Sequence, residues 1–150
     1  LLHEDDDIPS SLIDIAAQFG ASKIYFFLKN AGKKPLKSSL EGAMQSGNQA
    51  IIDDVLSLFG GFNGTSLIGA KAAASAGRID LLEEYFKVDS KISKKDVAEA
   101  AVKATIFIPL DFLRANSMVT EYLNALIEED IPSMLVQRFV PAFIKSFVTE

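Results

Sequence analysis

Residues 73–86 read Ala73-Ala74-Ser75-Ala76-Gly77-Arg78-Ile79-Asp80-Leu81-Leu82-Glu83-Glu84-Tyr85-Phe86. The first part holds small residues, which let a helix approach a neighbour closely, and the last part has bulky apolar residues at helical spacing. Gly77 between them suits a helix end, where the backbone needs a positive φ. The stretch therefore predicts two short helices joined by a tight turn.

The same pattern occurs three more times, with Gly20, Gly47 and Ala104 at the position of Gly77. Apolar residues stand seven positions before the turn residue and four and eight positions after it, and a small or apolar pair stands four and three positions before it. In chain order these residues are Ile13, Ala16, Ala17, Ile24 and Leu28; Leu40, Ala43, Met44, Ile51 and Val55; Ala70, Ala73, Ala74, Leu81 and Tyr85; and Val97, Ala100, Ala101, Ile108 and Phe112. The turn residues recur at intervals of 27, 30 and 27 residues, a range that indicates stacked structural repeats.

A unit of this length cannot bury its apolar face alone, so neighbouring units must stack to form a common core. We therefore predict an all-α chain, an α-solenoid of stacked helix-turn-helix repeats that forms a single domain over residues 1–150. The predicted repeats span residues 10–36, 37–65, 66–93 and 94–116, and a C-terminal capping helical segment spans residues 117–150. The alternative is an α-rich domain of another type, in which helix pairs separated by a glycine also occur.

Two segments carry a resemblance to a known family: Ile15-Ala16-Ala17-Gln18-Phe19-Gly20 with Ile24 and Leu28, and Ala73-Ala74-Ser75-Ala76-Gly77 with Leu81-Leu82. Together with the repetition over residues 10–116, they resemble the ankyrin repeat. Its consensus pairs a Thr-Pro-Leu-His-x-Ala-Ala opening with a Gly-His turn and an Ile-Val-x-x-Leu-Leu second helix. No unit here contains Thr-Pro-Leu-His, and the period is shorter than the family's usual length of about 33 residues. These departures concern the family's projecting β-hairpins more than its stacked helix pairs.

The resemblance implies a non-catalytic protein-protein interaction module that binds its partner on the concave face of an ankyrin-like solenoid. In that family the variable contact positions are the two residues just before each turn. Carried over unit by unit, the partner-binding candidates are Gln18, Phe19, Gln45, Ser46, Ser75, Ala76, Val102 and Lys103. Phe19 is the strongest candidate, since a large solvent-facing aromatic is typical of an interface anchor. The alternative is that Phe19 packs on the preceding linker.

Residues that would carry catalysis are scarce. His3 is the only histidine and lies beside the acidic run of Glu4 to Asp7, so we expect neither a histidine-assisted serine nucleophile nor a histidine metal site. The pairs Asp53-Asp54, Glu83-Glu84 and Glu128-Glu129 are expected on solvated helix faces, because adjacent helical residues do not converge on one point. We predict no enzyme activity, no catalytic residue, no cofactor and no metal site within this chain.

Two other functional classes stay open. The chain is alternatively an accessory or targeting region of a larger multidomain enzyme or of a secreted bacterial effector, whose catalytic part lies elsewhere in the polypeptide. It begins with Leu1 rather than methionine, which is consistent with excision from a longer protein. The third class is an α-helical enzyme domain of unfamiliar type.

The composition narrows the partner and the compartment. The net charge of −5 argues against general nucleic-acid binding, which needs a basic surface. No apolar run reaches the roughly 18 residues of a membrane span. The absence of cysteine fits a reducing compartment. We therefore expect a protein partner or other domains of a longer polypeptide, no nucleic acid, no membrane span, and a cytoplasmic location, which is the host cytoplasm in the case of a secreted effector.

Local signals predict individual elements. Helices are expected over residues 11–19, 22–30, 97–103 and 120–129, and a further helix begins near Pro109. In the second of these, Ile24, Phe27 and Leu28 are expected to face inward. Glycines favour a loop over residues 59–65, in which Phe59 and Phe62 are either core plugs or interface anchors.

Two segments have competing interpretations. The four lysines at 29, 33, 34 and 37 form either a solvated loop or a contact for an acidic partner. The apolar segment after Asp130 is either a cap on the last unit, the start of further repeats, or a helix that faces a partner or a membrane.

Overall fold

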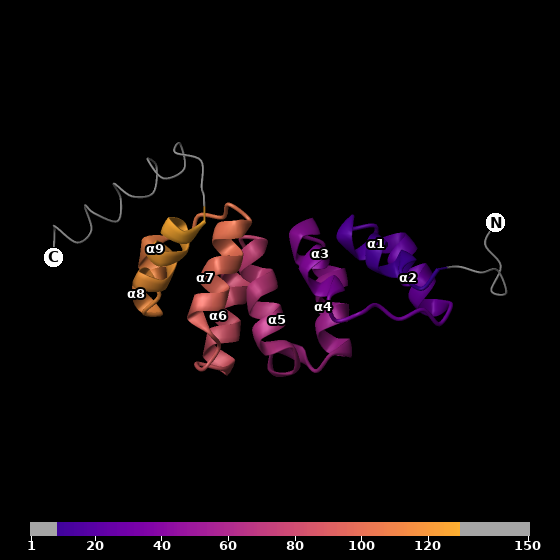
Figure 1. Ribbon diagram of the computed structural model, residues 1–150. Helices are drawn as coiled ribbons and strands as arrows, with labels where there is room; N and C mark the ends of the chain where they lie inside the picture. Colours follow the sequence, from indigo (N-terminus) through magenta and orange to yellow (C-terminus); the bar gives the residue numbers. More distant parts are fainter. Residues whose placement is uncertain (1–8, 130–150) are drawn as a thin grey trace.

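The computed structural model describes residues 9–129, which fold into nine α-helices with no strand among them (Figure 1). The prediction of an all-α chain is therefore confirmed for this part of the sequence. The helices are α1 (Leu12–Gln18), α2 (Ser22–Asn30), α3 (Ser39–Ser46), α4 (Gln49–Leu58), α5 (Gly61–Ser75), α6 (Ile79–Val88), α7 (Lys94–Lys103), α8 (Leu110–Ala115) and α9 (Val119–Glu128).

The odd-numbered helices lie side by side in one row, because α3 packs between α1 and α5, and α7 packs between α5 and α9. Each even-numbered helix packs on a member of that row: α2 on α1, α4 on α3, α6 on α5 and α8 on α9. Figure 1 shows the series running from α1 and α2 at one end to α8 and α9 at the other. All nine helices contribute buried side chains to one apolar core. Each fully buried large aliphatic side chain stabilises such a core by about 1.5–3 kcal/mol.

Glycine turns join the helices of the first three pairs. Gly20, Gly47 and Gly77 have φ values of 66°, 75° and 70°, in the left-handed region. After Gly77, the amide of Arg78 donates to the carbonyl of Ala73 at 2.9 Å, and Ala21 makes the same bond to Ala16 after Gly20. These are the hydrogen bonds of a Schellman helix end, which satisfy carbonyls that the helix itself leaves unpaired.

Two further turns have the same geometry without glycine. Thr105 and Ser117 have φ values of 56° and 54°, and the amides after them close the same bond, from Ile106 to Ala101 at 2.9 Å and from Met118 to Leu113 at 2.8 Å. The residue equivalent to Gly77 is therefore Thr105, and the predicted turn at Ala104 is wrong by one position. Ala104 is a C-cap with φ −83°, because α7 reaches one residue further than the alanine pair suggested.

The aligned apolar positions supply most of the core, but α2 departs from the prediction. In the first three units, the positions seven, four and three before the turn and eight after it are all buried. Ile24 and Phe27, however, are 53% and 51% exposed, whereas Tyr25 is fully buried. The prediction that Ile24 and Phe27 face inward is therefore wrong. The hydroxyl of Tyr25 donates to Asp54 of α4 at 2.7 Å, which directs Tyr25 toward the second unit.

The predicted loop over residues 59–65 is helical from Gly61. A non-helical Ser66, with φ 15° and ψ −107°, divides α5 into a short turn and the main helix. The hydroxyls of Thr65 and Tyr85 lie 2.6 Å apart in the core, which fixes the short turn against α6. Glycine content suggested a loop, whereas this buried contact favours a helix. Phe62 packs edge-on against the Tyr85 ring at 4.7 Å and is half-buried, as expected for a core plug.

The other predicted helices are confirmed within a few residues. Helix α2 has the predicted bounds, and α1 and α9 are each displaced by no more than one residue at either end. Helix α8 follows Pro109, which is its N-cap. Helix α7 begins three residues earlier than expected because Ser93 caps it, its hydroxyl accepting the Asp96 amide at 3.3 Å. The apolar segment after Asp130 lies outside the described residues.

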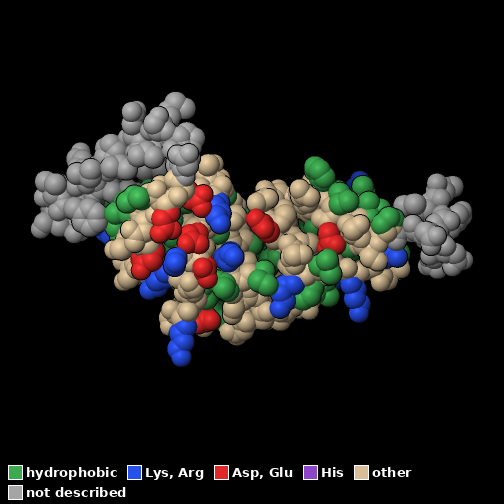
Figure 2. Space-filling model, in the orientation of Figure 1, with side chains coloured by type: hydrophobic (Ala, Val, Ile, Leu, Met, Phe, Trp, Pro, Cys, Tyr) green, Lys and Arg blue, Asp and Glu red, His purple; other side chains and the backbone are tan. Residues whose placement is uncertain are grey.

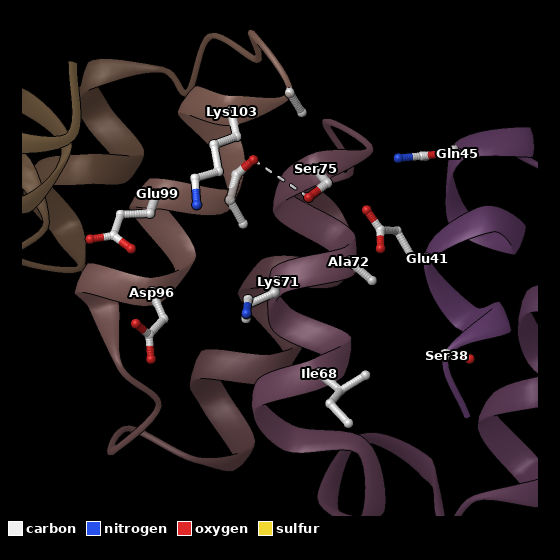
Figure 3. A pocket seen from close by; sticks show the side chains of 12 residues that line it. Ser38, Glu41, Gln45, Ile68, Lys71, Ala72, Ser75, Asp96, Glu99 and Lys103 are labelled. Carbon is white, nitrogen blue, oxygen red and sulfur yellow. Dashed lines mark hydrogen bonds between the residues drawn. The ribbon is translucent and has the colours of Figure 1, made fainter. Parts of the chain in front are cut away.

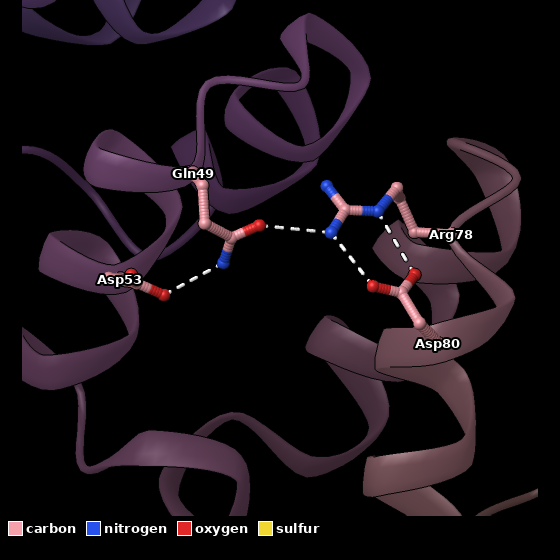
Figure 4. Close-up of polar contacts among 4 residues, drawn as sticks. All are labelled: Gln49, Asp53, Arg78 and Asp80. Atoms are coloured by element: carbon pink, nitrogen blue, oxygen red, sulfur yellow. Dashed lines mark hydrogen bonds and ion pairs between the residues drawn. The ribbon is translucent and has the colours of Figure 1, made fainter.

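Polar contacts also join the turns of neighbouring units. The side-chain amide of Asn48 donates to the Gly20 carbonyl at 3.1 Å, which links the second turn to the first. Arg78 of the third turn donates to Gln49 at 2.9 Å and binds Asp80 through two nitrogens (Figure 4). The hydrogen bond from Arg78 lowers the pKa of Asp80. Successive turns are therefore held in contact as well as the helices.

Candidate functional site

The odd-numbered helices present two rows of polar side chains. Counted from the turn residues Gly20, Gly47, Gly77 and Thr105, one row stands six positions before the turn and the other stands two positions before it. Since the two positions are four residues apart, both rows lie on the same face of each helix. We call this surface the furrow face, and its residues are Asp14, Glu41, Lys71 and Glu99 in the first row and Gln18, Gln45, Ser75 and Lys103 in the second.

A hollow of about 630 Å³ lies at the centre of the furrow face, between α3, α5 and α7 (Figure 3). It is lined by six of the furrow-face residues, namely Glu41, Gln45, Lys71, Ser75, Glu99 and Lys103. Ile68 and Ala72 of α5 add apolar surface. Ser75 donates to the Ala100 carbonyl at 3.5 Å, a long hydrogen bond that leaves the hydroxyl at the hollow. The hollow thus combines charged, neutral polar and apolar groups.

Two smaller hollows continue this surface toward both ends. One, of about 390 Å³, lies between α1 and α3 and shares Glu41 and Gln45 with the central hollow. The other, of about 340 Å³, lies between α7 and α9 and shares Glu99. Because neighbouring hollows share lining residues, the furrow face extends as one ridged surface from α1 to α9.

Carboxylates outnumber lysines along these three hollows. Their charged lining residues are Asp14, Glu41, Asp96, Glu99, Glu121 and Glu128 on the acidic side and Lys71, Lys95 and Lys103 on the basic side. The Nζ atom of Lys103 also lies 4.0 Å from Oε1 of Glu129. Figure 2 shows acidic side chains gathered over α7 and α9, with basic side chains between them. The net charge of the residues that line these hollows is therefore negative.

The structure places the sequence-predicted residues unequally. Gln18 lies at the hollow between α1 and α3, and Gln45 lies at that hollow and at the central one. Ser75 and Lys103 lie at the central hollow. Phe19 is 76% exposed, so the packing on a linker that was its alternative is not seen. Ser46 and Ala76 are half-buried in their turns, and the Ser46 hydroxyl donates to the Ala43 carbonyl at 2.7 Å.

Val102 is 2% exposed and belongs to the core. The prediction that Val102 contacts a partner depends on a turn at Ala104 and is wrong. With the turn at Thr105, Val102 aligns with the buried residues Ala17, Met44 and Ala74. The two residues before the fourth turn are instead Lys103 and Ala104, and both line the central hollow.

Sequence reasoning missed the first row of the furrow face. Asp14, Glu41, Lys71 and Glu99 were not selected because the family resemblance points only to the residues immediately before each turn. Their signal is present in the repeat itself, since the position is charged in every unit once the fourth turn is placed at Thr105.

The prediction that Asp54 is solvated is wrong. It was expected on a solvated face with Asp53, but its side chain is 15% exposed and accepts hydrogen bonds from Tyr25 and Lys29. Burial, followed by the hydrogen bond to Asp54, raises the pKa of Tyr25 well above its usual range.

The lysine cluster contacts its own chain at two residues. Lys29 binds Asp54, and Lys37 donates to the Gly64 carbonyl at 3.2 Å. Two of the four clustered lysines thus contact their own chain, which favours a structural role for them over contact with an acidic partner.

Within residues 9–129 the structure has neither a cluster of metal-ligating side chains nor a helix suited to cross a membrane. Residues 9–129 contain no group of three or more histidine, cysteine, aspartate or glutamate side chains placed to hold a metal ion. None of the helices in that range has the length and apolar character needed to cross a membrane. Comparison with protein-family models, with curated proteins and with solved structures gives no match to this chain.

Proposed function

We propose that this chain is a non-catalytic protein-protein interaction module, an ankyrin-like solenoid that binds its partner on the furrow face as its concave surface. The row of odd-numbered helices and the contacts between successive turns support the solenoid. The only histidine is His3, which supports a role without histidine-dependent catalysis. The absence of cysteine supports action in the reducing cytoplasm.

The two polar rows are the observation that carries this proposal. Within each first helix the core needs the apolar positions seven, four and three before the turn, and these are buried in the first three units. The positions six and two before the turn are polar in all four units, and none of these eight side chains is fully buried. Polar residues at solvent-facing positions are typical of any amphipathic helix. Here six of the eight also line one central hollow, and this convergence favours a binding surface.

The charge of the furrow face supports a partner with lysine or arginine in its contact region. Lys71 is the only basic residue of the first row, and it lies between Glu41 of α3 and Glu99 of α7 along the hollow (Figure 3). Electrostatic complementarity mainly raises the association rate and the specificity, and salt weakens it. We therefore expect affinity for such a partner to fall as ionic strength rises.

A displayed peptide library provides the probe. We expect selection on the intact chain to enrich peptides with several basic residues. Replacing Glu41 and Glu99 together by lysine is expected to weaken binding of the enriched peptides at least tenfold. Gln45→Ala is expected to weaken it less, because it removes a neutral contact. Glu83→Lys is the matched control, since Glu83 is exposed on α6, outside the furrow face.

Unchanged peptide binding by the furrow-face variants would contradict the proposal. If selected peptides bind the Glu41→Lys, Glu99→Lys double variant and the Gln45→Ala variant as tightly as the original chain, the furrow face is not the binding surface. Circular dichroism of each variant must match that of the original chain, so that a loss of binding reports the surface and not unfolding.

A further inference from the structure

The repeat shows which positions of a unit face the unit before it. The first of these lies five positions before the turn residue and is occupied by Gly42 in the second unit. A Cβ atom at Gly42 would lie 3.1 Å from the Cα and Cβ atoms of Gln18 in the first unit. In the third unit the same position is Ala72, which is 2% exposed. Side chains at this position therefore contact, or lie against, the preceding helix pair.

The position immediately before the turn also contacts the preceding unit. Ser46 holds it in the second unit, and its Cβ would lie 3.3 Å from a Cβ built on Gly20, the first turn. The position seven after the turn is Asp54 in the second unit, which accepts hydrogen bonds from Tyr25 and Lys29 of α2. Both positions are thus contacts between one unit and the unit before it.

Position four after the turn distinguishes the first unit from the next two. Ile51 and Leu81 occupy it in the second and third units, where they are 0% and 7% exposed. Ile24 occupies it in the first unit and is 53% exposed. The residue is a large aliphatic in all three, so the difference in exposure reflects the neighbours and not the residue type.

In the first unit all four positions hold large apolar side chains that are exposed. They are Ile15 (46%), Phe19 (76%), Ile24 (53%) and Phe27 (51%), and we call them the α1–α2 end face. Figure 2 shows hydrophobic side chains gathered over the α1 end of the molecule. Exposed apolar patches of this kind mark interaction surfaces.

We propose that the α1–α2 end face is an uncovered stacking face, and that a further helix pair of the same repeat type, preceding α1 in a longer polypeptide, covers it. In the second unit, Gly42, Ser46 and Asp54 lie against the helix pair immediately before them. Ile51 and Leu81 are also buried, whereas Glu84, at the position seven after the third turn, is exposed and pairs with Lys87 of its own helix. The end face thus continues an interface that the chain already uses between its own units. The end face adjoins the furrow face at Ile15, which also lines the hollow between α1 and α3. Phe19, Ile24 and Phe27 line none of the three hollows.

A pair of matched variants tests this proposal by thermal unfolding. Ile24→Ala and Ile51→Ala are made in the 150-residue chain and in the natural polypeptide extended by about one repeat, roughly 30 residues, before Leu1. In the 150-residue chain, Ile51→Ala is expected to lower Tm by about 10 °C, and Ile24→Ala by no more than about 2 °C. In the extended polypeptide both variants are expected to lower Tm by about 10 °C, because Ile24 is then buried.

Three results would overturn the proposal. The first is that the natural coding sequence before residue 1 contains no segment with the repeat pattern. The second is that Ile24→Ala lowers Tm as little in the extended polypeptide as in the 150-residue chain. In the third, sedimentation equilibrium shows that the 150-residue chain is a dimer which Ile24→Asp dissociates, so that a second copy is the occupant. None of these measurements involves the furrow face, so failure here leaves the proposed function standing, and failure of peptide binding leaves this proposal standing.

Discussion

The backbone of Gly69 in α5 lies directly against the ring of Tyr85 in α6, and a methyl group at position 69 would overlap the Tyr85 hydroxyl. Tyr85 is 1% exposed and its hydroxyl meets that of Thr65. The missing side chain at position 69 thus makes room for the largest buried residue of the third unit. The contact between Gly69 and Tyr85 brings α5 and α6 together at van der Waals distance.

Gly69→Ala is expected to destabilise the chain by about 1–3 kcal/mol. The sign is informative, because glycine to alanine inside a helix normally stabilises by up to about 1 kcal/mol. Gly42→Ala is the comparison, since its Cβ would lie 3.1 Å from Gln18 and needs only a small shift. Urea unfolding of both variants measures the difference, and equal stabilities would contradict the close packing of Gly69 on Tyr85.

Asp54→Ala is expected to cost about 1–3 kcal/mol, because it leaves the buried Tyr25 hydroxyl without its acceptor and removes the partner of Lys29. Asp53→Ala, at the neighbouring exposed position, should change the free energy of unfolding by less than about 0.5 kcal/mol. Chemical denaturation of the two variants separates the roles of adjacent carboxylates. If both are neutral, the contact between α2 and α4 does not depend on Asp54.

Thr105→Gly is expected to stabilise the chain by about 0.5–1 kcal/mol. A β-branched residue is strained at a φ of 56°, whereas glycine adopts this conformation freely. Part of the gain is offset because Thr105 donates a hydrogen bond to the Ala104 carbonyl at 2.7 Å, which glycine cannot make. Gly77→Ala, at the equivalent turn with φ 70°, should shift Tm in the opposite direction. A Tm lowered by Thr105→Gly would contradict the assignment of Thr105 as the turn residue.

Stability is expected to fall above about pH 10, the ordinary pKa of tyrosine. Burial raises the pKa of Tyr25, Tyr85 and Tyr122, so the folded chain keeps protons there that the unfolded chain releases. Their contribution is fully present below pH 10 and is lost as pH rises toward the folded pKa values. Tyrosinate absorbance and helical circular dichroism should therefore change together. Ionisation near pH 10 with full helicity would show that these hydroxyls are accessible to solvent.

The sequence was sufficient for the secondary structure of most units, because glycine turns and apolar spacing are local signals. Gly20, Gly47 and Gly77 are all left-handed turn residues, as their flanking patterns predicted. Where local signals conflicted, prediction failed. The run around Ala104 offered small residues but no glycine, so the turn was placed one residue early and Val102 was assigned to the surface. The glycines near Phe59 suggested a loop, whereas the contact between Thr65 and Tyr85 favours a helical turn.

The sequence by itself determined that the chain is helical and repeated, since periodicity and turn chemistry act over a few residues. Only tertiary structure decided which apolar residues are covered. Ile24 and Ile51 occupy the same place in the pattern, yet one is exposed and the other fully buried. Tertiary structure likewise decided that Asp54 is partly buried against Tyr25 and Lys29 while Asp53 is exposed, and that the two polar rows share one ridged surface. Burial depends on which unit lies next to a residue, and that is a property of the assembled stack.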